Sequence, residues 1–311
     1  MNAPKLKAST LEAVGNTPLV QLGKIVPASS AKVLIKLEYF NPTGSYKDRM
    51  ALGVIEEAEQ RGDLHPGMAV VEYTGGSTGS SLAFVCAVKG YPFKVVSSDA
   101  YSQEKLRTMQ AFGAELTIVP SDGGRITPDL MPRMIAKAQQ IADDGNAYFV
   151  NQFHNLDVTK GYTSLGREIL DQIDGPLDGF CAGIGTAGMF MGVVSVLREG
   201  SKAYFVALEP AASFILRDGE PGTHRIEGIS NGFMPPLLNK TYYHEAWGID
   251  ENEARHMARR LAKEEGIFAG TSTGVNVVGA VKLARHLGAG HTVVTVAVDS
   301  GLKYLAGNLY E

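Results

Sequence analysis

The chain has 311 residues, of which 44% are hydrophobic and 20% charged, a balance typical of an ordinary globular protein with room for two packed lobes. Its net charge of -4 and the lack of a lysine or arginine run argue against a nucleic-acid partner, which needs clustered positive charge. No apolar stretch approaches the ~20 residues that span a bilayer, and the start of the chain lacks a signal-peptide core, so we expect a cytoplasmic protein without a membrane partner.

Strands and helices alternate along most of the chain, and a glycine- and proline-rich passage at 210–238 interrupts the alternation. The predicted strands are 31–37, 70–73, 93–97, 115–119, 179–182, 203–208 and 292–298. The predicted helices are 50–61, 77–90, 103–112, 128–143, 159–173, 187–198, 251–265, 274–287 and a short one from about residue 302.

Short apolar runs separated by helices are the pattern of parallel sheets wrapped in helices. We therefore predict an α/β fold of two lobes, each a mostly parallel twisted sheet wrapped by helices. The smaller lobe is predicted to be residues 39–150, and the larger lobe residues 1–38 plus 151–311. Ligands of such folds bind at the carboxyl ends of strands, where the glycine-rich segments of this chain fall.

Cysteine and histidine usage gives no sign of a metal or of disulfides. Cys86 and Cys181 lie in apolar segments without the spacing of a bridge framework, so both are predicted to fill the core. The seven histidines form no His-x-x-x-His pattern and no His/Cys cluster, so we expect no metal site.

Lys47 lies in the segment 41–49, Asn-Pro-Thr-Gly-Ser-Tyr-Lys-Asp-Arg, where a loop turns into a helix. The positive end of the helix dipole and the nearby Arg49 both disfavour the protonated amine, which makes Lys47 a better nucleophile. Such an amine can hold a carbonyl cofactor as a Schiff base, with pyridoxal phosphate as the leading candidate. An ordinary solvated lysine of a first helical turn fits these nine residues equally well.

Two glycine-rich loops each lie between a strand and a helix. The first, residues 74–79, can point its backbone N–H groups at an anion such as the carboxylate of an amino acid. The second, residues 183–189, can cradle a phosphate with its amides and the Thr186 hydroxyl. It also matches Gly-x-Gly-x-x-Gly with Glu209 about 21 residues further on, the fingerprint of a dinucleotide site, so a dinucleotide oxidoreductase is an alternative. The lysine segment and the first loop favour pyridoxal phosphate, because a dinucleotide enzyme has no particular use for them.

Two later segments can contribute to the same site. Residues 266–274 form a small-residue loop before a helix and are best explained as its N-terminal cap. At the end of the last strand, a hydroxyl or carboxylate of Asp299 or Ser300 could face a pyridine nitrogen, and capping of the next turn explains either residue as well.

From Gly-Asn-Thr-Pro-Leu-Val at 15–20 to Asp-Ser-Gly-Leu-Lys-Tyr-Leu at 299–305, the chain resembles the fold-type II (tryptophan synthase β-like) pyridoxal phosphate enzymes. Within them it is similar to the cysteine synthase and cystathionine β-synthase family. By this resemblance Lys47 is the catalytic Schiff-base lysine. The cofactor would also be held by Ser77, by the phosphate loop and by Ser300 at its pyridine nitrogen, and the phosphate loop consists of Gly185, Thr186, Ala187, Gly188 and Met189. The resemblance assigns the substrate carboxylate to Thr74, Gly75, Gly76, Thr78 and Gln152, and it places Gly228 in a loop that lines the entrance.

The chain departs from the family pattern at three of these positions. Gly75 stands where the family has a serine, and Ser77 stands where it has an asparagine that contacts the 3-oxygen of the cofactor. Met189 replaces the last threonine of the phosphate loop, which removes one hydroxyl donor. We expect phosphate binding to persist on backbone amides and Thr186.

The resemblance implies β-replacement or β-elimination on a serine or cysteine derivative through an α-aminoacrylate, with a thiol or sulfide as co-substrate, in a homodimer of amino-acid biosynthesis. A neutral Ser300 hydroxyl at the ring nitrogen would favour elimination over transamination. Alternatives are a serine/threonine dehydratase, a threonine-synthase-like lyase and a relative that binds a partner without catalysis.

Overall fold

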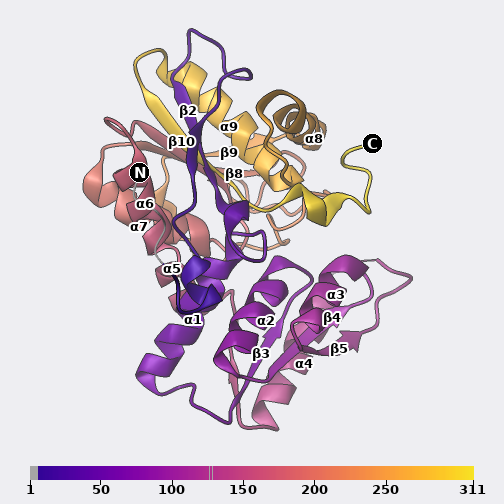
Figure 1. The fold of residues 1–311 in the computed structure, drawn as a ribbon. Helices are drawn as coiled ribbons and strands as arrows, with labels where there is room; N and C mark the ends of the chain where they lie inside the picture. Colours follow the sequence, from indigo (N-terminus) through magenta and orange to yellow (C-terminus); the bar gives the residue numbers. More distant parts are fainter. Residues whose placement is uncertain (1–5, 126, 128) are drawn as a thin grey trace. The chain divides into compact units, whose positions relative to one another are not determined.

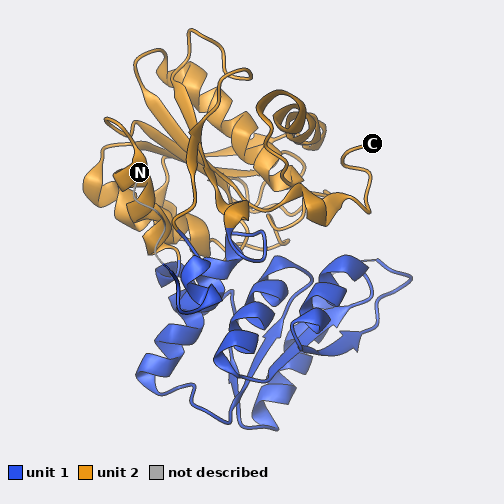
Figure 2. Cartoon of the chain, in the orientation of Figure 1, with its two compact units in different colours: residues 1–15, 41–161 blue, residues 16–40, 162–311 orange. Residues whose placement is uncertain are grey.

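The computed structural model describes residues 6–125, 127 and 129–311 (Figure 1). The chain divides into two compact units, which are Met1–Gly15 with Asn41–Gly161 and Asn16–Phe40 with Tyr162–Glu311 (Figure 2). The lobes proposed from the sequence placed residues 6–15 and 151–161 with the larger lobe, whereas here they group with the smaller unit.

The first unit contains a four-stranded parallel sheet with strand order β5-β4-β3-β6. Helix α1 packs on α2 and α5, and α4 packs on the sheet. Its strands are β3 (Ala69–Tyr73), β4 (Phe93–Ser98), β5 (Glu115–Val119) and β6 (Ala147–Phe149). Its helices are η1 (Thr10–Ala13), α1 (Lys47–Arg61), α2 (Ser77–Lys89), α3 (Gln103–Ala111), α4 (Leu130–Asp143) and α5 (Asp157–Lys160).

The second unit contains a six-stranded sheet with the order β1-β2-β10-β7-β8-β9, in which only the pairing of β1 with β2 is antiparallel among the described strands. Its strands are β1 (Leu19–Gln21), β2 (Lys32–Leu37), β7 (Gly179–Gly183), β8 (Tyr204–Pro210), β9 (Glu245–Ile249) and β10 (Thr292–Ala297). Its helical segments are η2 (Glu38–Phe40), α6 (Thr163–Gln172), α7 (Gly188–Gly200), η3 (Lys240–Tyr242), α8 (Glu251–Arg260), η4 (Leu261–Glu265), α9 (Thr271–Leu287) and η5 (Gly301–Tyr304).

Each unit has its own apolar core. In the second unit, α9 is buried along most of its length and packs against β7, β8 and β10. In the first unit, Val71 and Val96 of neighbouring strands pack with Leu130 and Met134 of α4. Cys86 and Cys181 are both buried, as predicted, and burial raises the pKa of each thiol to about 12. The predicted α/β fold with mostly parallel sheets is confirmed.

The predicted helix at 159–173 is wrong, because the chain forms α5 and α6 with a break at Gly161 and Tyr162. The break allows a close backbone contact, in which a Cβ on Gly161 would lie 2.8 Å from the carbonyl oxygen of Arg49 in α1. The predicted helix at 128–143 begins at Leu130, and residue 128 lies outside the described residues.

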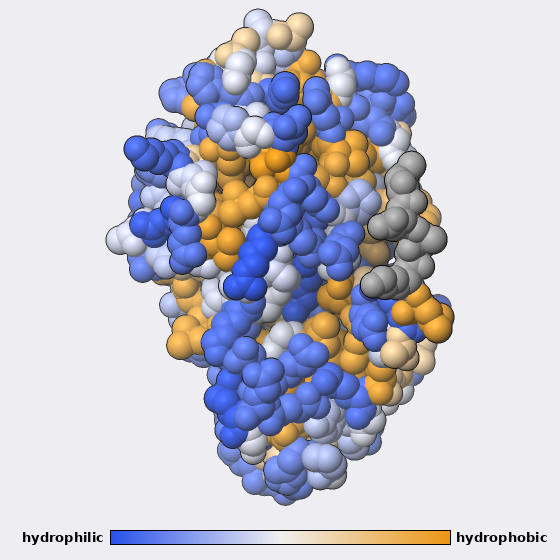
Figure 3. All heavy atoms as spheres, turned by 60° about the vertical axis from the view of Figure 1, so that its left-hand side comes forward, coloured by the Kyte–Doolittle hydropathy of each residue, from blue (hydrophilic) through white to orange (hydrophobic). Residues whose placement is uncertain are grey.

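The face drawn in Figure 3 is largely hydrophilic, with hydrophobic residues gathered in several patches between the polar ones. Within the described part of the chain, none of the helices has the length and apolar character needed to cross a bilayer. Among the same residues, no three or more His, Cys, Asp or Glu side chains gather as metal ligands.

Candidate active site

Helix α1 begins at Lys47 itself, three residues before the start predicted from the sequence. The turn before it is held by Asp48, whose buried carboxylate accepts hydrogen bonds from the backbone N–H of Thr43 at 2.7 Å and from its hydroxyl at 2.5 Å. Ser45 Oγ accepts the backbone N–H of Lys47 at 3.2 Å. These bonds fix the backbone of Lys47 at the first turn of the helix.

Lys47 and Glu72 are an electrostatically coupled pair within the first unit. Desolvation lowers the pKa of Lys47 to about 8, and the Glu72 carboxylate opposes this change. Burial raises the pKa of Glu72 to about 8, and hydrogen bonds from the backbone of Tyr73 and Gln152 oppose that change. The predicted weakening of the protonated amine is thus present, although desolvation is its main cause and Arg49 is not.

The first glycine-rich loop follows β3, and α2 begins at Ser77. The structure brings Thr78 and Gln152 together, since the Thr78 hydroxyl donates to Gln152 Oε1 at 2.8 Å. Gln152 Nε2 donates to the carbonyl oxygen of Tyr73 at 3.4 Å, and the N–H of Gly76 donates to Thr74 Oγ1 at 3.1 Å. These predicted carboxylate-binding residues therefore form one small polar cluster in the first unit.

The second glycine-rich loop, in the second unit, is built for close backbone approach. A Cβ on Gly185 would lie 2.2 Å from the carbonyl oxygen of Gly228, so the predicted entrance loop lies directly against the predicted phosphate loop. Ala187 has a φ of 68°, in the left-handed region, just before α7 begins at Gly188. Thr186 and Met189 are both buried. A tight turn at a helix N-terminus suits the phosphate group of a cofactor.

Asn276, a buried asparagine of α9, forms a hydrogen bond with the start of this loop. Asn276 Oδ1 accepts the N–H of Gly183 at 2.7 Å, and Asn276 Nδ2 donates to the carbonyl oxygen of Val296 in β10 at 2.8 Å. One side chain thereby connects the end of β7, where the loop begins, to a neighbouring strand.

Asp299 and Ser300 differ in what their side chains contact. Asp299 is buried, and its Oδ2 accepts a hydrogen bond from the Tyr304 hydroxyl at 3.0 Å. Ser300 Oγ accepts the N–H of Leu302 at 3.3 Å as the cap of η5, which leaves its own proton available to another acceptor.

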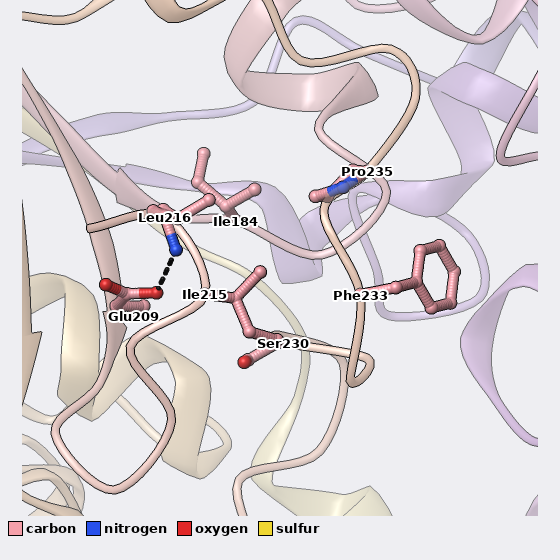
Figure 4. A pocket seen from close by; sticks show the side chains of 7 residues that line it. All are labelled: Ile184, Glu209, Ile215, Leu216, Ser230, Phe233 and Pro235. Atoms are coloured by element: carbon pink, nitrogen blue, oxygen red, sulfur yellow. Dashed lines mark hydrogen bonds between the residues drawn. The ribbon is translucent and has the colours of Figure 1, made fainter. Parts of the chain in front are cut away.

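A small pocket lies beside the phosphate loop in the second unit (Figure 4). The Glu209 carboxylate in this pocket accepts the backbone N–H groups of Leu216 at 2.8 Å and Arg217 at 3.3 Å. Burial raises the pKa of Glu209. This carboxylate fixes the segment after β8, and that role accounts for the acid that resembled part of a dinucleotide fingerprint. The lining residues are Ile184, Glu209, Ile215, Leu216, Ser230, Phe233 and Pro235.

Sequence reasoning missed Glu72 and Asn276, and it gave no role to Tyr101 and Lys105, which lie over the first loop. Glu72 had a usable signal, because it is an acid within the apolar run of β3. The other three contact their loops from distant segments, and local patterns carry no sign of such contacts.

The residues present fit pyridoxal phosphate. The first unit supplies an amine with a lowered pKa, and the second supplies a backbone cradle that a Cβ at Gly185 would fill. Each feature by itself suits one group of a phosphorylated carbonyl cofactor, the amine its carbonyl carbon and the cradle its phosphate, and both are typical of the class of enzymes that use such a cofactor.

Comparison with known proteins identifies the family to which the chain belongs. The family model described as pyridoxal-phosphate dependent enzyme matches residues 10–299, and the chain belongs to this family. The chain is 41% identical to the cysteine synthase of Staphylococcus aureus (strain Mu50) over 300 residues, which cover 96% of this chain and 95% of the relative.

Two solved structures are similar over nearly their whole length. The cysteine synthase of Entamoeba histolytica matches with a TM-score of 0.92 and 33% identity, covering 100% of this chain and 93% of the other. The O-acetylserine dependent cystathionine β-synthase of Helicobacter pylori matches with a TM-score of 0.91 and 31% identity, covering 99% and 100%. The predicted family, fold type and cofactor are confirmed, and so is the reaction class, β-replacement on a serine derivative. The dinucleotide alternative is set aside.

Proposed function

We propose that this protein replaces the acetate of O-acetylserine by sulfide to form cysteine. The observation that carries the proposal is the desolvated amine of Lys47, whose pKa is lowered to about 8 next to a buried carboxylate. Support for this choice of substrates comes from relatives named cysteine synthase and O-acetylserine dependent cystathionine β-synthase.

Lys47 would hold pyridoxal phosphate covalently, and its Nζ, once released, would accept the proton from the substrate Cα. A pKa near the working pH suits both tasks, because a neutral amine is nucleophilic and a proton acceptor. When bound, the cofactor supplies the electron sink that makes this proton acidic and lets a group leave from Cβ.

Thr78 and Gln152 would orient the substrate through its carboxylate, together with the backbone of Thr74, Gly75 and Gly76. Their polar cluster fixes the position of the glutamine amide, so the carboxylate would bind in one orientation. Ser77 would contact the cofactor from the same loop.

The cofactor phosphate would bind the segment from Gly185 to Met189, and Gly228 would line the entrance beside it. We assign the pyridine nitrogen to Ser300, as the family resemblance implies, because its hydroxyl can donate a hydrogen bond to that nitrogen. The neutral Ser300 hydroxyl keeps its proton for the ring nitrogen.

The test is product analysis of the purified protein with pyridoxal phosphate. We expect cysteine from O-acetylserine and sulfide, and much slower release of ammonia from serine, cysteine or threonine. Faster ammonia release from serine or threonine would support the dehydratase alternative instead. Lys47→Ala should remove both the visible absorbance of the bound cofactor and the activity, whereas Lys32→Ala, at an exposed lysine, should remove neither.

The cytoplasmic location remains a proposal from the sequence, and the homodimer remains a proposal from the family resemblance. Mass measurement in solution tests the dimer directly.

A further inference from the structure

Tyr101, in the segment between β4 and α3, lies over the first glycine-rich loop. A Cβ on Gly75 would lie 2.2 to 2.4 Å from Cδ1, Cε1 and Cγ of the Tyr101 ring. The hydroxyl is two bonds beyond Cε1, so it also lies close to the loop. Both residues belong to the first unit. The ring therefore occupies the space where a side chain at position 75 would begin.

The turn that carries Tyr101 is held by several hydrogen bonds. The N–H of Tyr101 donates to the carbonyl oxygen of Ser98 at 3.2 Å, and the N–H of Ala100 donates to Ser98 Oγ at 3.3 Å. Asp99 Oδ1 accepts the N–H of Ser121, which follows β5, at 2.8 Å. These bonds fix the backbone from which the Tyr101 ring reaches the loop.

The Tyr101 hydroxyl has no hydrogen-bond partner among the residues that the structure describes, although the side chain is half-buried. A buried tyrosine hydroxyl usually finds a partner. Burial raises the pKa of Tyr101, so the hydroxyl keeps its proton and remains a donor. A hydrogen-bond donor beside the first loop is therefore available to a ligand.

Positions 75 and 78 of the loop offer an anion no free hydroxyl proton of their own. The Thr78 hydroxyl donates to Gln152 Oε1 at 2.8 Å, and Gly75 has no side chain. The Tyr101 ring fills the space where a side chain at position 75 would stand. Its hydroxyl is therefore the neighbouring group that can supply the missing donor.

We propose that Tyr101 is a substrate-recognition residue, whose hydroxyl donates a hydrogen bond to the α-carboxylate of the amino-acid substrate at the loop 74–78. This inference rests on the proposed function, in which that loop binds the substrate carboxylate. Recognition of the carboxylate is then shared between the loop and the segment before α3. An amine without a carboxylate gains nothing from this donor.

The test compares binding of L-serine with binding of 2-aminoethanol, which is serine without its carboxylate, to the holoenzyme, followed by the change in visible absorbance. Tyr101→Phe removes the hydroxyl and keeps the ring over Gly75, and Tyr101→Leu removes the hydroxyl in case the first variant does not fold. Tyr242→Phe is the matched control, because Tyr242 is also half-buried and its hydroxyl has no hydrogen-bond partner within the described part of the chain.

We expect Tyr101→Phe and Tyr101→Leu to weaken L-serine binding by about 10-fold or more, as loss of a hydrogen bond to a charged group does. Binding of 2-aminoethanol should change by less than about 2-fold, and Tyr242→Phe should leave the binding of both ligands unchanged. Unchanged L-serine binding, or an equal loss for both ligands, would overturn the inference and leave the proposed function intact. A wild-type protein without cofactor absorbance would overturn the proposed function, and this inference with it.

Discussion

The close contact between Gly75 and Tyr101 predicts a specific pairwise coupling. A Cβ at position 75 would lie 2.2 Å from Cδ1, 2.3 Å from Cε1 and 2.4 Å from Cγ of the Tyr101 ring. Carbon atoms in good contact lie roughly 3.5 Å apart, so the ring would have to move by more than about 1 Å. Because Cγ is only one bond from Cβ, this movement requires a new side-chain rotamer or a shift of the backbone before α3.

We therefore expect Gly75→Ala to lower the free energy of unfolding by about 1 to 3 kcal/mol, the usual cost of overpacking. In a Tyr101→Ala background the same substitution should cost much less, because the obstructing ring is gone. A double-mutant cycle of urea unfolding isolates this coupling from the loss of the ring itself. Gly23→Ala is the control for adding a methyl group, since nothing lies within 4 Å of a Cβ there.

Equal costs of Gly75→Ala in the two backgrounds would refute the reasoning, and so would a cost no larger than that of Gly23→Ala. A second pair of variants, Gly75→Ser with and without Tyr101→Ala, tests whether this contact also affects substrate specificity. If the ring takes the place of the serine found in the family, Gly75→Ser should be tolerated only when Tyr101 is replaced by alanine, and the Michaelis constant for the amino acid should follow the same pattern.

Three further predictions concern the remaining site residues. In the apoprotein, the pKa of Glu72 is raised from 4.5 to about 8, so between these pH values Glu72 binds more protons in the folded state than in the unfolded state and stability should fall as the pH rises. The pKa of Lys47 is lowered from 10.5 to about 8, so Lys47 binds fewer protons in the folded state and stability should rise again from pH 8 to 10.5. Thermal unfolding followed against pH should therefore show a minimum of stability near pH 8, and Glu72→Gln should abolish the fall between pH 4.5 and 8. Identical pH profiles of the wild type and Glu72→Gln would contradict the raised pKa of Glu72. Gly185→Ala should weaken pyridoxal phosphate binding and cost about 1 to 3 kcal/mol in unfolding free energy, because its methyl would lie 2.2 Å from the Gly228 carbonyl oxygen. Cofactor titration of the apoenzyme checks this, and unchanged affinity would argue against a cradle at this loop. Thr78→Val should raise the Michaelis constant for the amino acid by about 10-fold and leave the cofactor absorbance intact. Steady-state kinetics measures this constant, and an unchanged value would show that the hydroxyl does not help to bind the substrate.

The strands of both sheet centres could be predicted because parallel strands are buried on both faces and appear as continuous apolar runs. The strands β1, β6 and β9 were missed, since they are short and largely exposed or half-buried, and β1 and β9 also mix polar with apolar residues. The break at Gly161 could not be predicted either, because it depends on the backbone of α1, over a hundred residues earlier in the chain.

The local sequence predicted the two glycine-rich loops, in which backbone atoms form the candidate site. Glycines after strands at 75 and 185 indicated the two loops, because close approach of backbone atoms leaves no space for a Cβ. The side chains that surround these loops were not indicated, since Tyr101 and Lys105 approach Gly75 and Gly76 from positions 26 and 29 residues later in the sequence. Their role depends on three-dimensional proximity.

The two hydrogen bonds of the Asn276 side chain limit which residues can replace it. Its amide presents an oxygen to the Gly183 N–H and a nitrogen to the Val296 carbonyl oxygen, and only a side chain with one acceptor and one donor satisfies both. An ionised aspartate of the same shape would set two oxygens against each other at the Val296 carbonyl inside the core, and a leucine would leave both backbone groups without this partner. The geometry of the second glycine-rich loop therefore depends on one buried amide that both donates and accepts a hydrogen bond, which neither a charged nor an apolar group of equal size can reproduce.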